Sequence, residues 1–166
     1  MYTQNLVKEL HRAKIPALFL KLDIAKAFDS VRWDYLQEVM QAMGFGIRWC
    51  NWVSILLLTA TTSVFLNGTR GKWFRQHNGL RQGDPLSPML FILAMEPLQL
   101  LIQKATADGD LQNFNLRTAR LRISLYADDA ALFLRPVKEE LSKVQEILST
   151  FGEVSGLKVN TTKSAV

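Results

Sequence analysis

Apolar residues recur along the chain with two periods, one typical of helices and one typical of strands. Residues 5–14 carry a weak helical stripe that Pro16 closes, because proline cannot continue a helix. Residues 17–23 alternate instead, with leucine at every second position and Asp23 at the end. This alternation predicts a half-buried strand that finishes in an acid.

The following segments favour two helices and a hairpin. Residues 32–43 have apolar side chains at helical spacing and are followed by a glycine, which commonly ends helices. Residues 47–60 are apolar on nearly every side, which predicts a helix buried all round. Residues 61–66 and 72–77 are strand-like, and the Asn-Gly pair between them predicts a hairpin.

A loop rich in glycine and proline, residues 79–88, precedes a long apolar helix. Ser87 is expected as the N-cap and Pro88 as the first helical residue. The helix is expected to reach about residue 105. We expect a bend or an interruption at Pro97, because proline removes a hydrogen bond and clashes with the preceding turn.

The last third of the chain predicts a second hairpin, a helix and a short strand. The apolar runs 121–125 and 130–134 flank a turn at 126–129 that holds two carboxylates. A helix is expected over 137–151, and a turn with a short strand over 156–163. The buried stripe expected on this helix consists of Val137, Leu141, Val144, Leu148 and Phe151. Helices and strands in this order indicate an α+β fold, a mostly antiparallel sheet with helices on one face.

Composition limits the chain to one ordinary globular domain over residues 1–166. Hydrophobic residues make up 48% and charged residues 21%, which excludes disorder, collagen and coiled coil. Cys50 is the only cysteine, so an internal disulfide and a thiolate-rich zinc site are excluded. No signal peptide or stretch of roughly 18 apolar residues occurs, so no membrane association is expected. The formal charge of +5 favours polyanionic partners.

Three aspartates are the candidate catalytic groups. Asp23 ends a strand, and Asp128 and Asp129 lie at a hairpin tip, so an antiparallel sheet permits them to meet. Converging carboxylates repel unless they share protons or hold hard cations such as Mg²⁺. Two such ions would stabilise the attacking and leaving oxygens of a displacement at phosphorus. Taken alone, however, Asp-Asp is better explained as a solvated turn, and Asp23 as a solvated strand end.

The loop at 79–88 suits a phosphate-bearing ligand. Its glycines let the backbone approach a ligand closely, and Arg81 and Gln82 offer planar donors. It also leads into a helix N-terminus, where the dipole favours an anion. Its composition fits an ordinary Gly-Pro loop equally well, and it is neither a P-loop nor a Rossmann fingerprint.

Four segments have distinctive amino-acid sequences: LKLDIAKAFDSV at 20–31, GLRQGDPLSP at 79–88, YADD at 126–129 and GLKVNTTKS at 156–164. In this order they resemble the successive palm motifs of reverse transcriptases, and nearly the whole chain is covered. The motif sequences are most similar to those of non-LTR (LINE-type) retrotransposons, especially those of plants. The resemblance implies a polymerase palm-like fold with part of the fingers.

The resemblance also implies RNA-directed DNA polymerase activity by two-metal nucleotidyl transfer. Asp23 and Asp128 would bind metal, Asp129 would complete the acidic cluster, and the carbonyl of Ile24 would add a ligand. The implied cofactor is a pair of Mg²⁺ ions, for which Mn²⁺ is a possible substitute.

Further residues match the family's substrate contacts. Phe28 falls where the family places the aromatic side chain that crowds the sugar 2′ position; core packing is the alternative explanation. Gln82 and Gly83 match the loop that contacts the incoming nucleotide and template, beside Arg81. Lys163 matches a lysine near the leaving pyrophosphate; a solvated terminal lysine is the alternative explanation.

The implied partners are an RNA template, a DNA primer and deoxynucleoside triphosphates, and the implied location is the nucleus. The remaining fingers, the thumb and an endonuclease segment are expected elsewhere in a parent polyprotein, because the chain starts and ends close to the palm motifs. One alternative is a catalytically inactive or domesticated fragment that binds RNA or a protein; the intact acidic cluster counts against it. Another is a nucleotidyl cyclase, which Phe28 and the loop at 79–88 disfavour.

Overall fold

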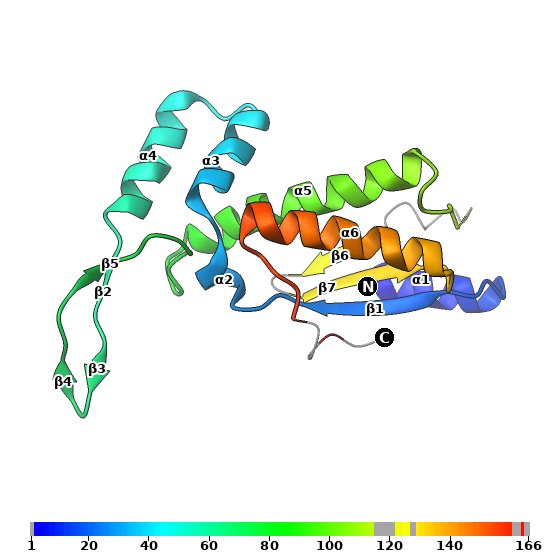
Figure 1. The fold of residues 1–166 in the computed structure, drawn as a ribbon, viewed down its shortest axis with the longest axis horizontal. Coiled ribbons are helices and arrows are strands. Elements are labelled where there is room, and N and C mark those ends of the chain that lie inside the picture. Colours follow the sequence, from blue (N-terminus) through cyan, green and yellow to red (C-terminus); the bar gives the residue numbers. More distant parts are fainter. Residues whose placement is uncertain (1, 115–121, 127–128, 161–163, 165–166) are drawn as a thin grey trace.

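The computed structural model describes residues 2–114, 122–126, 129–160 and 164. Helices and strands are mixed along the chain, with small paired strands in the middle (Figure 1). The elements are α1 (Tyr2–Arg12), β1 (Leu18–Asp23), α2 (Ala27–Ser30), α3 (Trp33–Ala42), α4 (Ile47–Leu58), β2 (Thr61–Thr62), β3 (Phe65–Leu66), β4 (Thr69–Arg70), β5 (Phe74–Arg75), α5 (Ser87–Ala107), β6 (Ile123–Tyr126), β7 (Asp129–Leu134) and α6 (Lys138–Ser155).

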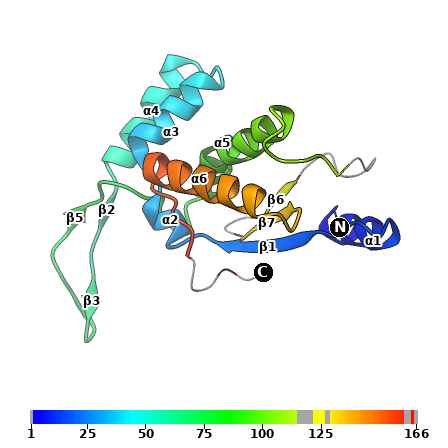
Figure 2. The same cartoon turned by 45° about the vertical axis from the view of Figure 1, so that its right-hand side comes forward.

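Three antiparallel strands form the central sheet in the order β1-β7-β6. Helices α5 and α6 lie together over one face of this sheet in both views (Figures 1 and 2). Side chains alternate between the faces of a strand. Leu132 and Leu134 of β7 therefore join the main core, while Phe133 packs with Leu6 and Leu10 of α1. The predicted α+β architecture is confirmed, and α1 adds a small second core.

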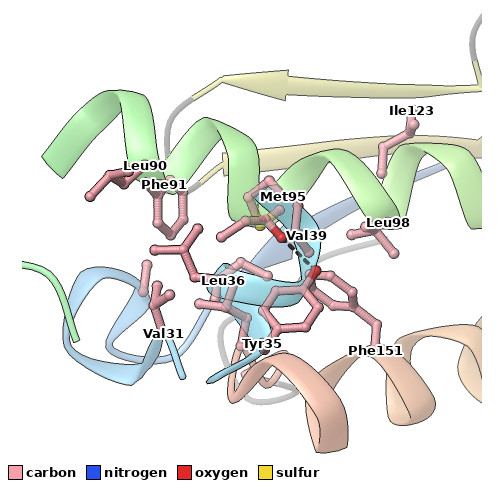
Figure 3. Packing of buried hydrophobic residues seen from close by; sticks show 14 of the residues in the cluster. Val31, Tyr35, Leu36, Val39, Leu90, Phe91, Met95, Leu98, Ile123 and Phe151 are labelled. Carbon is pink, nitrogen blue, oxygen red and sulfur yellow. Dashed lines mark hydrogen bonds between the residues drawn. The ribbon is translucent and has the colours of Figure 1, made fainter. Parts of the chain in front are cut away.

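The main core lies where α3, α5 and α6 meet (Figure 3). The Tyr35 hydroxyl donates a hydrogen bond of 2.8 Å to the carbonyl of Ala94, so this buried polar atom is satisfied. The ring of Phe151 meets Tyr35 edge-on, with centroids 6.2 Å apart. Burial raises the pKa of Tyr35, because a charged phenolate would lose its hydration.

A buried ion pair lies at the N-terminal end of α6, and nothing in the apolar pattern predicts it. Glu140 accepts a hydrogen bond of 3.1 Å from Arg122 Nη1, and also accepts from the backbone N–H groups of Gln112 and Arg135. Burial lowers the pKa of Arg122. The stripe expected on this helix is corrected accordingly: Glu140 is buried, whereas Val137 and Leu141 are exposed.

The prediction that the helix at residues 47–60 is buried all round is wrong. Only three residues of α4, Cys50, Val53 and Leu57, are buried. The side chain of Ile55 is 58% exposed and that of Leu58 is 61% exposed, because α4 packs mainly against α3 and projects beyond the sheet. We call α4 and the hairpin after it, residues 47–77, the distal region.

The hairpin predicted after α4 is confirmed, but its strands are short. Asn67 and Gly68 both have positive φ, at 49° and 78°, which is typical of the two-residue turn that an Asn-Gly pair favours. Strands β3 and β4 pair beside this turn, and β2 and β5 pair at the other end of the hairpin. We call residues 61–77 the hairpin arm; it reaches away from the sheet in both views (Figures 1 and 2).

Helix α5 runs without interruption through Pro97, so the alternative of an interruption is wrong. Its N-cap is Leu86 rather than Ser87, and the carboxylate of Asp84 accepts a hydrogen bond of 2.9 Å from the Leu86 N–H. Within the described residues, no helix combines the length and apolar character needed to cross a membrane.

Candidate active site

An open cleft of about 510 Å³ lies where β1 ends and α2 begins. Residues from three of the four motifs line it. They are Asp23, Ile24, Ala25, Lys26, Ala27, Phe28, Asp29, Gln82 and Asn160. The cleft therefore joins the end of an acid-tipped strand to the glycine-rich loop.

The acidic end of β1 is held from two sides. Asp23 lies directly opposite Asp129 in the β1–β7 register, which places their Cα atoms about 4.5–5.5 Å apart. On the other side, the Asn160 N–H donates to the Asp23 carbonyl at 2.8 Å, and Ile24 forms an antiparallel bridge with Val159. The segment after residue 156, expected to form a short strand, makes only this isolated bridge within the described residues, and it lies beside the acidic strand end.

Phe28 is fixed at the inner wall of the cleft. Its ring stacks on the buried ring of Phe91, with centroids 4.7 Å apart and planes inclined by 17°. Its carbonyl accepts a hydrogen bond of 2.6 Å from the Leu80 N–H. The ring is half-buried: it packs against the main core, and the residue also lines the cleft.

The glycine-rich loop is clamped onto α2 at Gly79. This residue has φ +81°, and a Cβ there would lie 2.6 Å from the Asp29 carbonyl oxygen, so only glycine fits. The Gly79 N–H donates to the Val31 carbonyl at 2.7 Å, and its own carbonyl accepts from the Trp33 indole at 2.7 Å. The clamp brings Gln82 to the rim of the cleft, 3.5 Å from a carboxylate oxygen of Asp29.

The chain matches the family model of reverse transcriptase (RNA-dependent DNA polymerase) over residues 2–166. It belongs to the reverse transcriptase family.

Relatives of this reverse transcriptase domain include proteins of non-LTR elements. The chain is 30% identical over 162 residues to a 149 kDa protein of transposon TX1 from Xenopus laevis, covering 98% of the chain and 12% of that protein. It is 28% identical to the Pol polyprotein of retrotransposable element R2 from Nasonia vitripennis, covering 89% of the chain and 14% of that protein. The chain therefore spans about an eighth of these relatives.

The fold is also that of a solved polymerase. A structure of telomerase from Candida albicans, in complex with a fragment of telomeric RNA, superposes with a TM-score of 0.70 at 14% identity. The superposition covers 99% of this chain and 29% of the telomerase chain. The expected polymerase palm-like fold is confirmed.

Four of the predicted site residues of this reverse transcriptase domain line the cleft: Asp23, Ile24, Phe28 and Gln82. Arg81 and Gly83 are exposed and are not among the lining residues; an Arg81 guanidinium nitrogen lies 3.4 Å from the Leu56 carbonyl instead. Asp129 is placed through its backbone. Asp128 and Lys163 lie outside the described residues, so their roles stay predictions.

Sequence reasoning missed three polar lining residues, Lys26, Asp29 and Asn160. Lys26 has φ 48°, a left-handed conformation that turns the chain between β1 and α2. Asp29 lies in the first turn of α2, where the helix dipole is the ordinary explanation for an acid, yet it also borders the cleft. The signal available was position: all three residues lie inside the first or the fourth motif.

The donor groups at the cleft fit a hard cation. Carboxylate and carbonyl oxygens are the ligands that Mg²⁺ accepts, and the Asp23–Asp129 register brings two acidic residues onto facing backbone positions. Among the residues that the structure describes, no group of three acidic, histidine or cysteine side chains forms a metal site. The ligand role of Asp128, which lies outside these residues, stays a prediction.

Proposed function

We propose that this domain catalyses RNA-directed DNA synthesis as part of a retrotransposon polyprotein. In this reaction a primer 3′-hydroxyl attacks the α-phosphate of a deoxynucleoside triphosphate, a new phosphodiester bond forms, and pyrophosphate leaves. The observation that carries the proposal is the cleft, where Asp23, opposite Asp129 in the sheet, lies with Phe28 and Gln82. Little covalent chemistry is required of the protein, so its task is positioning and charge stabilisation.

Four residues would hold the metal: the carboxylates of Asp23, Asp128 and Asp129, and the carbonyl of Ile24. Bound there, two Mg²⁺ ions, or Mn²⁺ in their place, would neutralise the charge that develops on the attacking and leaving oxygens. The pairing of β1 with β7 fixes the backbone position of Asp23 opposite Asp129.

The other cleft residues would select and orient the nucleotide. The ring of Phe28, held by the Phe91 stack, would exclude a nucleotide that carries a 2′-hydroxyl. Gln82 would contact the incoming nucleotide or the template from the clamped loop, with Arg81 and Gly83 beside it. Lys163 would neutralise or protonate the leaving pyrophosphate.

The proposed partners are an RNA template, a DNA primer, deoxynucleoside triphosphates, and the remaining fingers, thumb and endonuclease segments of the polyprotein. The relatives' greater length supports a polyprotein context. We further propose a plant host, which the sequences of the four motifs support. We also propose a nuclear location, because elements of this kind prime synthesis on chromosomal DNA.

Primer extension tests the proposed activity. A longer protein that contains this domain is given an RNA template, a labelled DNA primer, deoxynucleotides and Mg²⁺. Asp23→Asn and Asp128→Asn should each lower extension by about 100-fold or more, because transition-state charge loses its stabilisation. Asp108→Asn removes an exposed carboxylate at the far end of α5 and should leave extension unchanged. Full extension by Asp23→Asn or by Asp128→Asn would disprove the proposal.

Sugar selection tests the Phe28 assignment separately. Phe28→Val removes the ring and should raise the kcat/KM for ribonucleotides relative to deoxynucleotides. The control is Phe45→Val, which changes an aromatic residue outside the cleft lining. An unchanged ratio in Phe28→Val would reject the gate role while leaving the polymerase proposal intact.

A further inference from the structure

The distal region and its flanks carry the whole net charge of the protein. Residues 39–83 contain no aspartate or glutamate, and five basic residues give this stretch a charge of +5. The formal charge of the complete chain is also +5. These five residues are Arg48, Arg70, Lys72, Arg75 and Arg81.

Three of the basic residues lie on the hairpin arm among exposed rings. The side chains of Phe65 and Trp73 are 60% and 58% exposed. The Arg70 guanidinium lies over both, 5.1 Å from the Phe65 centroid and 4.7 Å from the Trp73 centroid. Lys72 and Arg75 flank this cluster in sequence, and both are exposed.

Single-stranded nucleic acid is the partner whose chemistry matches both features. Proteins bind such strands by stacking bases on aromatic side chains and by neutralising the backbone with Lys and Arg. An apolar protein partner would cover the rings but would leave Arg70, Lys72 and Arg75 without counter-charges, because no acid occurs nearby in the sequence. A duplex would satisfy the charges and leave the rings without bases to stack on.

The arm is also joined directly to the cleft. Its last strand, β5, is followed within a few residues by the Gly79 clamp and by Gln82 at the cleft rim. The Gln76 N–H donates to the Ala60 carbonyl at 3.1 Å, and the Gln76 side-chain amide donates to Thr62 at 3.1 Å. These bonds tie the two sides of the arm together at its base.

We propose that the hairpin arm binds the single-stranded RNA template outside the cleft, with bases stacked on Trp73 and Phe65 and phosphates neutralised by Arg70, Lys72 and Arg75. The choice of RNA rests on the proposed function; the charge and the exposed rings are independent of it. The arm thereby makes a second nucleic-acid contact that needs no metal and no acidic residue.

The test measures binding of a labelled single-stranded RNA to the 166-residue chain by fluorescence anisotropy, in EDTA and over a range of salt concentrations. Trp73→Ala should raise Kd by about 5- to 150-fold, as expected for the loss of one stacked base. Replacing Arg70, Lys72 and Arg75 together by Gln should reduce the slope of log Kd against log salt by about 2.

Two matched controls separate stacking and local charge from general effects. Leu66→Ala removes an apolar side chain at the arm's tip that is 73% exposed and cannot stack, so Kd should not change. A triple Gln variant of Lys8, Arg12 and Lys138 removes the same charge from exposed positions elsewhere and should keep the salt slope.

The proposal is overturned if the wild-type chain does not bind, if both triple variants lose the same slope, or if Leu66→Ala weakens binding as much as Trp73→Ala. It is also overturned if Trp73→Ala abolishes self-association or capture of a protein while RNA binding is retained. Equal binding of single-stranded DNA would support the stacking mode and reject RNA selectivity. Because this assay is run in EDTA and needs no extension, failure of the polymerase proposal in primer extension is visible separately.

Discussion

The palm body and the distal region are both rich in apolar residues, but the body buries them and the distal region leaves many of them exposed. In the body, formed by the β1-β7-β6 sheet with α3, α5 and α6, Leu36 and Leu98 are fully buried. In the distal region, Ile55 and Leu58 are more than half exposed. Helix α5 packs against α3, α6 and β6, whereas α4 packs mainly against α3. Burial thus follows the number of covering layers rather than the apolar content of a helix.

The largest effect is expected from the body's buried ion pair. Glu140→Gln leaves the Arg122 guanidinium buried without its counter-ion, since both side chains are under 5% exposed. Removing one partner of a buried pair costs about 3–5 kcal/mol, so the free energy of unfolding should fall by that amount in urea titrations. The distal region contains no acid to form such a pair.

Glu146→Gln on the same helix is the matched control. Its carboxylate lies 3.3 Å from Lys143 Nζ but is 68% exposed, so solvent screens the pair. An unfolding midpoint close to that of the wild type is expected. If both variants lose the same free energy of unfolding, the conclusion that the buried Arg122–Glu140 pair stabilises the body is wrong.

Leucine truncation compares the two regions directly. Leu98→Ala opens a cavity in the fully buried core and should lower the free energy of unfolding by about 2–5 kcal/mol. Leu58→Ala removes a side chain that is already 61% exposed and should change the free energy of unfolding by less than about 0.5 kcal/mol. A large loss in Leu58→Ala would show that the exposed face of α4 is covered in solution.

The sequence predicted the body better than the distal region, because periodicity reports local structure and only indirectly reports neighbours. The alternation of residues 17–23 predicted β1, and the second hairpin predicted β6 and β7. The apolar α4 was expected to be buried, since periodicity cannot count the layers around a helix. The buried Glu140 was missed because a charged residue in an amphipathic helix is ordinarily solvated.

The candidate site was predictable as far as its motifs extend. Asp23, Phe28 and Gln82 were identified from motif positions and meet in one cleft. Asn160 was not, because its place beside Asp23 depends on an antiparallel bridge between residues more than 130 positions apart. Such long-range backbone pairing leaves no signature in local composition.

Two glycines with left-handed backbone provide a smaller contrast. Gly156, at the end of α6, has φ +83°, and a Cβ there would lie 2.2 Å from the Ser30 carbonyl oxygen. Gly68, in the hairpin arm, has φ +78° and no atom within 4 Å of such a Cβ. Gly68→Ala should cost about 1–2 kcal/mol from backbone strain alone, and Gly156→Ala should cost more because of the added clash. Urea titrations of both variants measure the difference, and equal costs would contradict the clash.

The smallest effect is expected from acid titration of the body's surface. Arg32 hydrogen-bonds the carboxylate of Asp34 and holds its pKa below the ordinary value of 3.8. A depressed pKa contributes stability above the unfolded value, and that contribution is lost as the pH falls through the folded value. Asp34→Asn should therefore reduce the loss of stability as the pH falls below about 4, measured by urea titration at each pH. Arg70→Gln should leave this acid dependence unchanged, because residues 39–83 hold no carboxylate that titrates. A changed acid dependence in Arg70→Gln would instead mean that an acid from the body reaches the hairpin arm, and the two regions would then be electrostatically coupled.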